Sequence, residues 1–128
     1  MRILLDTCTF LWITADSPEL SADAKRLFTD RSNEVFLSVI SAWEISVKHA
    51  LGKLPLPEPP QQFVPRQRAA HGAASLPLDE MAVLQLPGLP QLHKDPFDRM
   101  LVCQAIAAGL TLLTPDAAIR AYSVPTMW

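Results

Sequence analysis

The stretch that decides the fold is residues 95–116, DPFDRMLVCQAIAAGLTLLTPD. Asp95 suits a helix N-cap, a proline fills the first helical position, and Gly109 stands just past the last turn. These signals predict a helix from Pro96 to Ala108. The helix is apolar nearly all round, which is typical of a helix packed against a sheet. An apolar strand from Leu110 to Thr114 follows at once.

The rest of the chain repeats this alternation of strands and helices. Arg2–Leu5 is a short apolar run that ends at Asp6, and Val35–Val39 is rich in β-branched residues, so both are predicted to be buried strands. Further helices are expected over 7–13, 21–30, 41–51, 61–70 and 79–86, a proline-rich connector over 54–60, a short strand over 74–78, and a turn over 87–90. This order implies an α/β fold, a three-layer sandwich around a mostly parallel central sheet.

Length and composition restrict the class of protein further. A chain of 128 residues with 49% hydrophobic content suits one domain over 1–128. No stretch approaches the roughly 20 apolar residues of a membrane span, and Asp6 interrupts any export signal. We therefore expect a cytoplasmic protein whose Cys8 and Cys103 are reduced core thiols. A net charge of −2 gives no global attraction to nucleic acid, so an anionic substrate must be received locally.

Five carboxylates occupy the ends of predicted strands and the starts of predicted helices. Asp6 and Asp116 end strands, and Glu44 lies in the helix after the second strand. Asp95 and Asp98 lie three residues apart at a helix start, where they face one side and also gain from the helix dipole. Sites in such sheets form at the carboxyl ends of the strands. An oxygen-rich pocket without paired cysteine or histidine ligands suits Mg²⁺ or Mn²⁺ rather than zinc, and such ions can cut a phosphodiester bond.

Helix capping is the structural alternative for several of these acids. Asp6 and Asp116 each precede a helix, where aspartate is a common N-cap. Ser41 and Glu44 match the capping box, in which the glutamate accepts from a backbone amide at the helix start. The position of Glu44 in line with the apolar stripe of its helix favours instead a buried carboxylate with a cation partner.

Other polar residues have weaker assignments. Three threonines near the strand ends can hold water or phosphate through their hydroxyls, or serve only as caps: Thr7, Thr9 and Thr114. Candidates for phosphate contacts, which can equally be solvated surface residues, are Arg66, Arg68 and Lys94. The scattered histidines, to which no catalytic role is assigned, are His49, His71 and His93.

Four motifs together carry a resemblance to a known family: ILLDT at 3–7, SAWEI at 41–45, HKDPFDR at 93–99 and LLTPD at 112–116. In this order they resemble PIN-domain ribonucleases, specifically VapC-type toxins of bacterial toxin–antitoxin pairs, over essentially the full length. The resemblance implies a PIN-like fold and a Mg²⁺- or Mn²⁺-dependent endoribonuclease. Its core acids would be Asp6, Glu44 and Asp98, with Asp116 as the fourth and Asp95 in support. It further implies an RNA substrate, a homodimer and a cognate antitoxin.

Two other functions remain open at this point. Haloacid-dehalogenase-like phosphatases also place a metal-binding aspartate after the first strand, but usually add an acid two residues on, where this chain has Cys8. A catalytically inactive PIN-like module that only binds a partner would retain its acids as helix caps. The complete acidic set argues against such decay. Apolar side chains that suit a contact surface or the core equally are Phe10, Trp12, Leu27, Phe28, Trp43 and Leu51.

Overall fold

Five parallel strands form the central sheet of the computed structural model, which describes residues 1–128. The strands are β1 (Arg2–Leu5), β2 (Glu34–Ser38), β3 (Ala74–Leu76), β4 (Thr111–Leu113) and β5 (Thr126–Met127). Their order across the sheet is β3-β2-β1-β4-β5, and every neighbouring pair is parallel. The sheet predicted to be mostly parallel is therefore entirely so.

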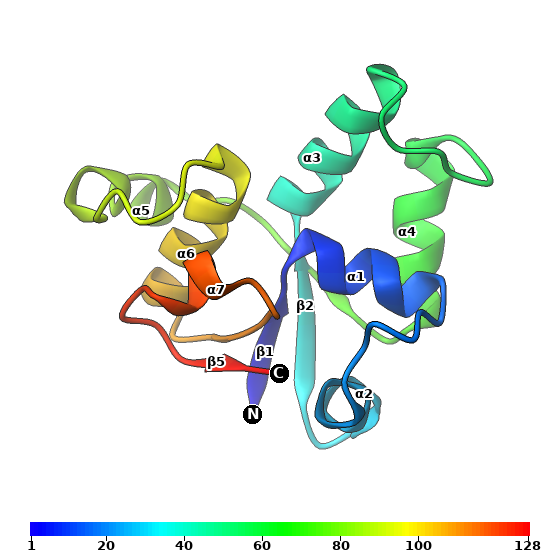
Figure 1. The fold of residues 1–128 in the computed structure, drawn as a ribbon, viewed down its shortest axis with the longest axis horizontal. Coiled ribbons are helices and arrows are strands. Elements are labelled where there is room, and N and C mark those ends of the chain that lie inside the picture. Colours follow the sequence, from blue (N-terminus) through cyan, green and yellow to red (C-terminus); the bar gives the residue numbers. More distant parts are fainter.

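Helices cover both faces of this sheet (Figure 1). They are α1 (Thr7–Thr14), α2 (Ala22–Thr29), α3 (Val39–Ala50), α4 (Pro60–Ala70), α5 (Glu80–Val83), the 3₁₀ turn η1 (Leu86–Gly88), α6 (Pro96–Ala108) and α7 (Ala117–Arg120). In Figure 1, α1, α2 and α4 lie on one side of β1 and β2, and α5, α6 and α7 lie on the other. None of these helices is long and apolar enough to cross a membrane.

Alternation along the strands builds two cores at once. Ile3 and Leu5 pack into the core under α1, α2 and α4, whereas Leu4 packs into the core under α6 and α7. In β4, Leu113 and Leu112 divide between the two cores in the same way. Successive side chains of a strand point to opposite faces, so a strand covered on both sides must be apolar throughout. The predicted three-layer sandwich is confirmed.

The long helix α6 has the predicted bounds because its signals are local. The Asp95 side chain accepts from the backbone N–H groups of Phe97 and Asp98, and Pro96 takes the first position. Gly109 ends the helix with a φ of +66°, a left-handed conformation that glycine adopts without strain.

The start of α3 differs from the prediction. The helix begins at Val39, and Ser38 is both the last residue of β2 and the N-cap, because its Oγ accepts from the backbone N–H of Ile40 at 3.0 Å. Strand and helix thus follow one another without a loop. Ser41 lies inside the helix and not at its start, so the capping-box interpretation of Glu44 is wrong.

Smaller differences lie in the second half of the chain. The predicted strand over 74–78 is three residues long, the predicted turn over 87–90 is replaced by η1, and β5 was not predicted. Strand β5 pairs with β4, and the Thr114 N–H donates to the Met127 carbonyl at 3.1 Å. Of the apolar side chains considered as contact surfaces, Phe10 and Leu27 are buried, Trp12 and Phe28 are partly buried, and Trp43 and Leu51 are exposed.

Candidate metal centre

The carboxyl end of β1 lies where the chain changes direction across the sheet. From β1 the chain continues to β2 and β3 on one side, and it then returns to add β4 and β5 on the other. Open α/β sheets bind ligands in the crevice at such a point, because the loops after the two central strands diverge there. Asp6 directly follows β1 and Thr114 directly follows β4, so both lie at this crevice.

Asp6 is both a helix cap and a member of the crevice. Its carboxylate is buried, its Oδ1 accepts from the backbone N–H of Thr9 at 2.8 Å, and its Oδ2 accepts from the Thr114 hydroxyl at 2.5 Å. Burial raises the pKa of Asp6 despite these hydrogen bonds, and the charge of Asp116 adds to the rise. Capping takes one oxygen only, so capping and metal binding are compatible at this residue.

Glu44 carries a buried carboxylate oxygen that has no partner. Its Oε2 accepts a hydrogen bond from the Lys48 ammonium one turn further along α3, whereas its Oε1 is buried without any hydrogen bond. Ser41, the supposed capping partner, has its Oγ 2.9 Å from the Thr7 hydroxyl, which donates to it. An unsatisfied buried acceptor destabilises a fold by about 1–3 kcal/mol, and by more when charged. A bound cation would remove that penalty.

Asp98 has the most perturbed pKa of the crevice. Desolvation, followed by the charges of Asp95, Glu44 and Asp6, raises the pKa of Asp98 to about 7. Its side chain is 17% exposed, so solvent screens these charges only in part. The effect also shows that the four acids, which come from three separate segments of the chain, share one electrostatic environment.

Asp116 and Asp98 are joined by His93, which the sequence prediction left without a role. Nε2 of His93 lies 3.1 Å from Oδ2 of Asp98 and 3.1 Å from Oδ2 of Asp116. The other oxygen of Asp116 caps α7 by accepting from the backbone N–H of Ala118 at 2.8 Å. Burial opposes the charge on Asp116, but the hydrogen bonds from His93 and the helix amides outweigh it and lower the pKa.

Cys8 is exposed beside the crevice, so its assignment to the core is wrong, whereas Cys103 is buried as predicted. Partial desolvation raises the pKa of Cys8 to about 11, and the charges of the surrounding carboxylates contribute: Asp6, Asp98, Asp116 and Glu44. A thiol with this pKa is protonated at neutral pH in the metal-free protein, which disfavours Cys8 as a nucleophile.

The threonine hydroxyls near the crevice bond to protein groups. Thr9 donates to the Leu113 carbonyl at 3.1 Å, and Thr114 both donates to Asp6 and accepts from the backbone N–H of Asp116 at 3.1 Å. Thr114 therefore orients two of the five acids at the end of β4.

Replacing Thr114 by valine should therefore destabilise the protein. The change preserves the shape of the side chain but removes one hydrogen bond to a buried carboxylate and one to a backbone amide, a loss of roughly 2–4 kcal/mol. Urea unfolding at pH 7.5 measures it. The matched control is Thr29→Val, at an exposed position of α2, for which a change below about 0.5 kcal/mol is expected. Equal effects of both substitutions would contradict a special role for Thr114.

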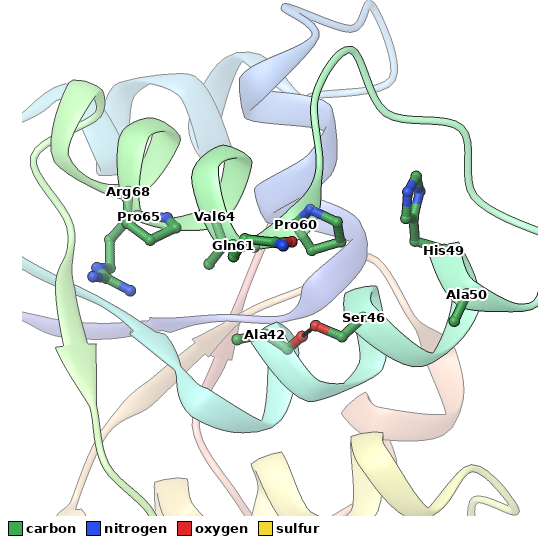
Figure 2. A pocket seen from close by; sticks show the side chains of 9 residues that line it. All are labelled: Ala42, Ser46, His49, Ala50, Pro60, Gln61, Val64, Pro65 and Arg68. Atoms are coloured by element: carbon green, nitrogen blue, oxygen red, sulfur yellow. Dashed lines mark hydrogen bonds between the residues drawn. The ribbon is translucent and has the colours of Figure 1, made fainter.

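Other sequence candidates lie outside the crevice. Arg66 pairs with Glu58, and Lys94 is an exposed neighbour of His93. Arg68 lines a separate groove of about 450 Å³ between α3 and α4 (Figure 2). The other residues around that groove are Ala42, Ser46, His49, Ala50, Pro60, Gln61, Val64 and Pro65. None of them carries a carboxylate, so this groove is not part of the acidic site.

The residues of the crevice fit a hard divalent ion. Carboxylate oxygens predominate, one of them is buried without a partner, and burial makes the ionised forms of Asp6 and Asp98 unfavourable without a counter-charge. One carboxylate oxygen of Asp98 and one of Asp116 lie within 4.8 Å of each other, a spacing that one ion can bridge, and a ring nitrogen of His93 lies within the same distance of both. Oxygen-rich sites of this kind suit Mg²⁺ or Mn²⁺.

The parallel sheet, its helical layers and the carboxylates gathered after β1 and β4 define an α/β protein with an acidic centre at its switch point. The family model of the PIN domain matches residues 3–125, and the chain therefore belongs to the PIN-domain family.

Individual relatives are similar over different lengths. Ribonuclease VapC16 of Mycobacterium tuberculosis is 41% identical over 66 residues, which are 48% of this chain and 47% of that protein. The match thus spans about half the length of this curated relative.

Solved structures match the whole fold. VapBC2 from Rickettsia felis, bound to a DNA fragment from its promoter, gives a TM-score of 0.75 at 15% identity over 100% of this chain and 99% of that chain. VapBC-1 from nontypeable Haemophilus influenzae gives 0.65 at 16% identity over 99% and 97%. At such identities the likeness concerns the fold, and it confirms the PIN-like architecture.

Proposed function

We propose that this chain is a metal-dependent endoribonuclease and the toxin of a toxin–antitoxin pair. The observation that carries the proposal is the partnerless Oε1 of Glu44, buried among acids at the switch point of a PIN-domain fold. A carboxylate oxygen held in this way stabilises nothing in the protein alone. The similarity to a curated ribonuclease supports RNA as the substrate.

In this proposal Asp6, Glu44, Asp98 and Asp116 hold Mg²⁺ or Mn²⁺, and Asp95 supports them. The ion would supply a water of lowered pKa and neutralise charge on the phosphate. The chain's own residues keep the acids in place before the ion arrives. Thr114 orients Asp6, and caps on α1, α6 and α7 fix one oxygen each of Asp6, Asp95 and Asp116.

Lys48 balances part of this negative charge. Its ammonium donates to Oε2 of Glu44, and that hydrogen bond raises the pKa of Lys48, which remains cationic at neutral pH. Only one of the two Glu44 oxygens is compensated in this way. We assign Lys48 to charge balance, with Oε1 left available to the ion.

The test is cleavage of a mixed RNA pool by the purified protein with Mg²⁺ or Mn²⁺, run beside a chelator. Asp6→Asn should cleave RNA roughly 10³-fold more slowly or worse, because losing the ion removes several kcal/mol of transition-state stabilisation. The matched control is Asp23→Asn, at an exposed position of α2, and this variant should cut RNA as the wild type does. Cleavage that survives the chelator, or survives Asp6→Asn in a folded protein, would overturn the proposal.

A cognate antitoxin and a second copy of the chain are the proposed partners, and the cytoplasm is the proposed location. Two of the solved relatives are described as VapBC assemblies. Trp43 on α3 and Leu51 at its end are 59% and 64% exposed, and they offer apolar contact area on this part of the surface. Light scattering of the purified chain distinguishes a dimer from a monomer, and Trp43→Ser should shift a dimer toward monomer if α3 contributes to the interface.

A further inference from the structure

The loop that carries His93 is tied to the body of the protein through Tyr122. The buried Tyr122 hydroxyl oxygen accepts from the backbone N–H of His93 at 2.9 Å and from that of Leu92 at 3.2 Å. Two hydrogen bonds to one buried oxygen fix the backbone just before α6. The backbone position from which the imidazole side chain of His93 extends is therefore fixed.

The imidazole ring is fixed by a further contact. The backbone N–H of Asp95 donates to Nδ1 of His93 at 3.0 Å. A ring nitrogen that accepts a hydrogen bond must present its lone pair, so the proton of the neutral ring is on Nε2. Nε2 is the atom that lies 3.1 Å from Oδ2 of both Asp98 and Asp116.

This arrangement distinguishes two possible roles of His93. A histidine that ligates a metal presents a bare nitrogen to the ion. Here the bare nitrogen faces a backbone amide, and the nitrogen that faces the centre carries a hydrogen. That hydrogen can hold two mutually repelling carboxylates side by side, one at the start of α6 and one at the start of α7.

We propose that His93 is a positioning residue and not a metal ligand: its Nε2–H holds Asp98 and Asp116 in place, and the carboxylates alone bind the ion. This inference rests on the proposed metal-dependent function. It deepens that function by assigning a role to the one imidazole of the site, and it predicts that a donor of another chemical type can replace the ring.

Two substitutions separate the roles by calorimetric Mn²⁺ binding at pH 7.5. His93→Ala removes the donor and should weaken Mn²⁺ binding roughly tenfold, the usual effect of losing a group that orients metal ligands. His93→Gln keeps an N–H donor at a similar reach without an imidazole nitrogen, and it should bind within about threefold of the wild type. The matched control is His71→Ala at the end of α4, with unchanged binding. A Gln variant as weak as the Ala variant would overturn the proposal.

The ring itself can be observed by long-range ¹H–¹⁵N NMR of histidine-labelled protein. We expect the spectrum to show that Nε2 of His93 is protonated and that Nδ1 is not. The result should be the same without metal and with Mg²⁺. A bare Nε2 in the presence of Mg²⁺ would identify His93 as a ligand and overturn the inference.

The outcomes also separate this inference from the proposed function. If the wild type binds Mn²⁺ and cuts RNA while His93→Ala binds equally well, the positioning role fails and the nuclease stands. If the wild type neither binds Mn²⁺ nor cuts RNA, the nuclease proposal fails, and the positioning role fails with it.

Discussion

Replacing Asp98 by asparagine is expected to abolish RNA cleavage and, at the same time, to raise the melting temperature of the metal-free protein. Asparagine has nearly the same shape as aspartate but lacks the negative charge that binds a metal ion. Losing several kcal/mol of metal-borne stabilisation would slow cleavage roughly 10³-fold or more. If Asp98 served only to stabilise the fold, its replacement would lower the melting temperature and would leave cleavage by the folded protein unchanged.

The gain in stability follows from the raised pKa of Asp98. At pH 8 the folded protein must hold this carboxylate ionised beside Asp95, Glu44 and Asp6, although burial and those charges raise its pKa to about 7. Discounted for partial solvent screening, removing the charge should stabilise the fold by on the order of 1–2 kcal/mol, or roughly 3–8 °C for a domain of this size.

Thermal melting at pH 8 in the presence of a chelator, together with RNA cleavage in Mn²⁺, measures both effects. The matched control is Asp79→Asn, the same chemical change at the N-cap of α5, where the side chain accepts from the Ala82 amide. Asparagine also caps helices well, so little change in either measurement is expected. A lower melting temperature for Asp98→Asn would show that the acid is structural.

Metal affinity should fall steeply as the pH drops below 7. The ion needs Asp98 ionised, and a pKa of about 7 means that a proton competes for the same oxygens at neutral pH. Between pH 7.5 and 5.5 the ionised fraction of such a group falls roughly 20- to 30-fold, and the dissociation constant should rise by a similar factor. Asp6, whose pKa burial also raises, acts in the same direction.

The stability of the metal-free protein should have the opposite pH dependence. Because the folded-state pKa of Asp98 lies above the unfolded value, the folded state binds more protons between about pH 4 and 7. Stability from this group is complete below that window and is lost as the pH rises through it. Melting scans from pH 5 to 8, with and without Mn²⁺, should therefore diverge as the pH rises, and scans that stay parallel would contradict the shift.

The sequence predicted best the elements whose signals are local. The cap, proline and glycine of α6 gave its bounds, and the run before Asp6 gave β1, because both depend on neighbours in the chain. The apparent conflict between capping and metal binding at Asp6 and Asp116 disappears in the structure, since each uses Oδ1 for the helix and turns Oδ2 to the crevice.

What the sequence did not predict depends on contacts between distant segments. The two residues of β5 form a strand only because β4 lies beside them. His93 has a role only because its partner Asp116, 23 positions away, is brought to it by the sheet. The start of α3 was misplaced because Ser38 and Ser41 are both acceptable caps in sequence, and only the end of β2 decides between them.

The side chains of β1 alternate between the two cores, and this alternation limits insertions and deletions in the strand. Removing or adding one residue within 3–5 would exchange the two sets of packed side chains and move Asp6 by about 3.3 Å along the sheet. Substitutions of one apolar side chain by another leave both cores and the acid where they are. We therefore expect natural variants to differ in the identity of residues 3–5 but not in their number.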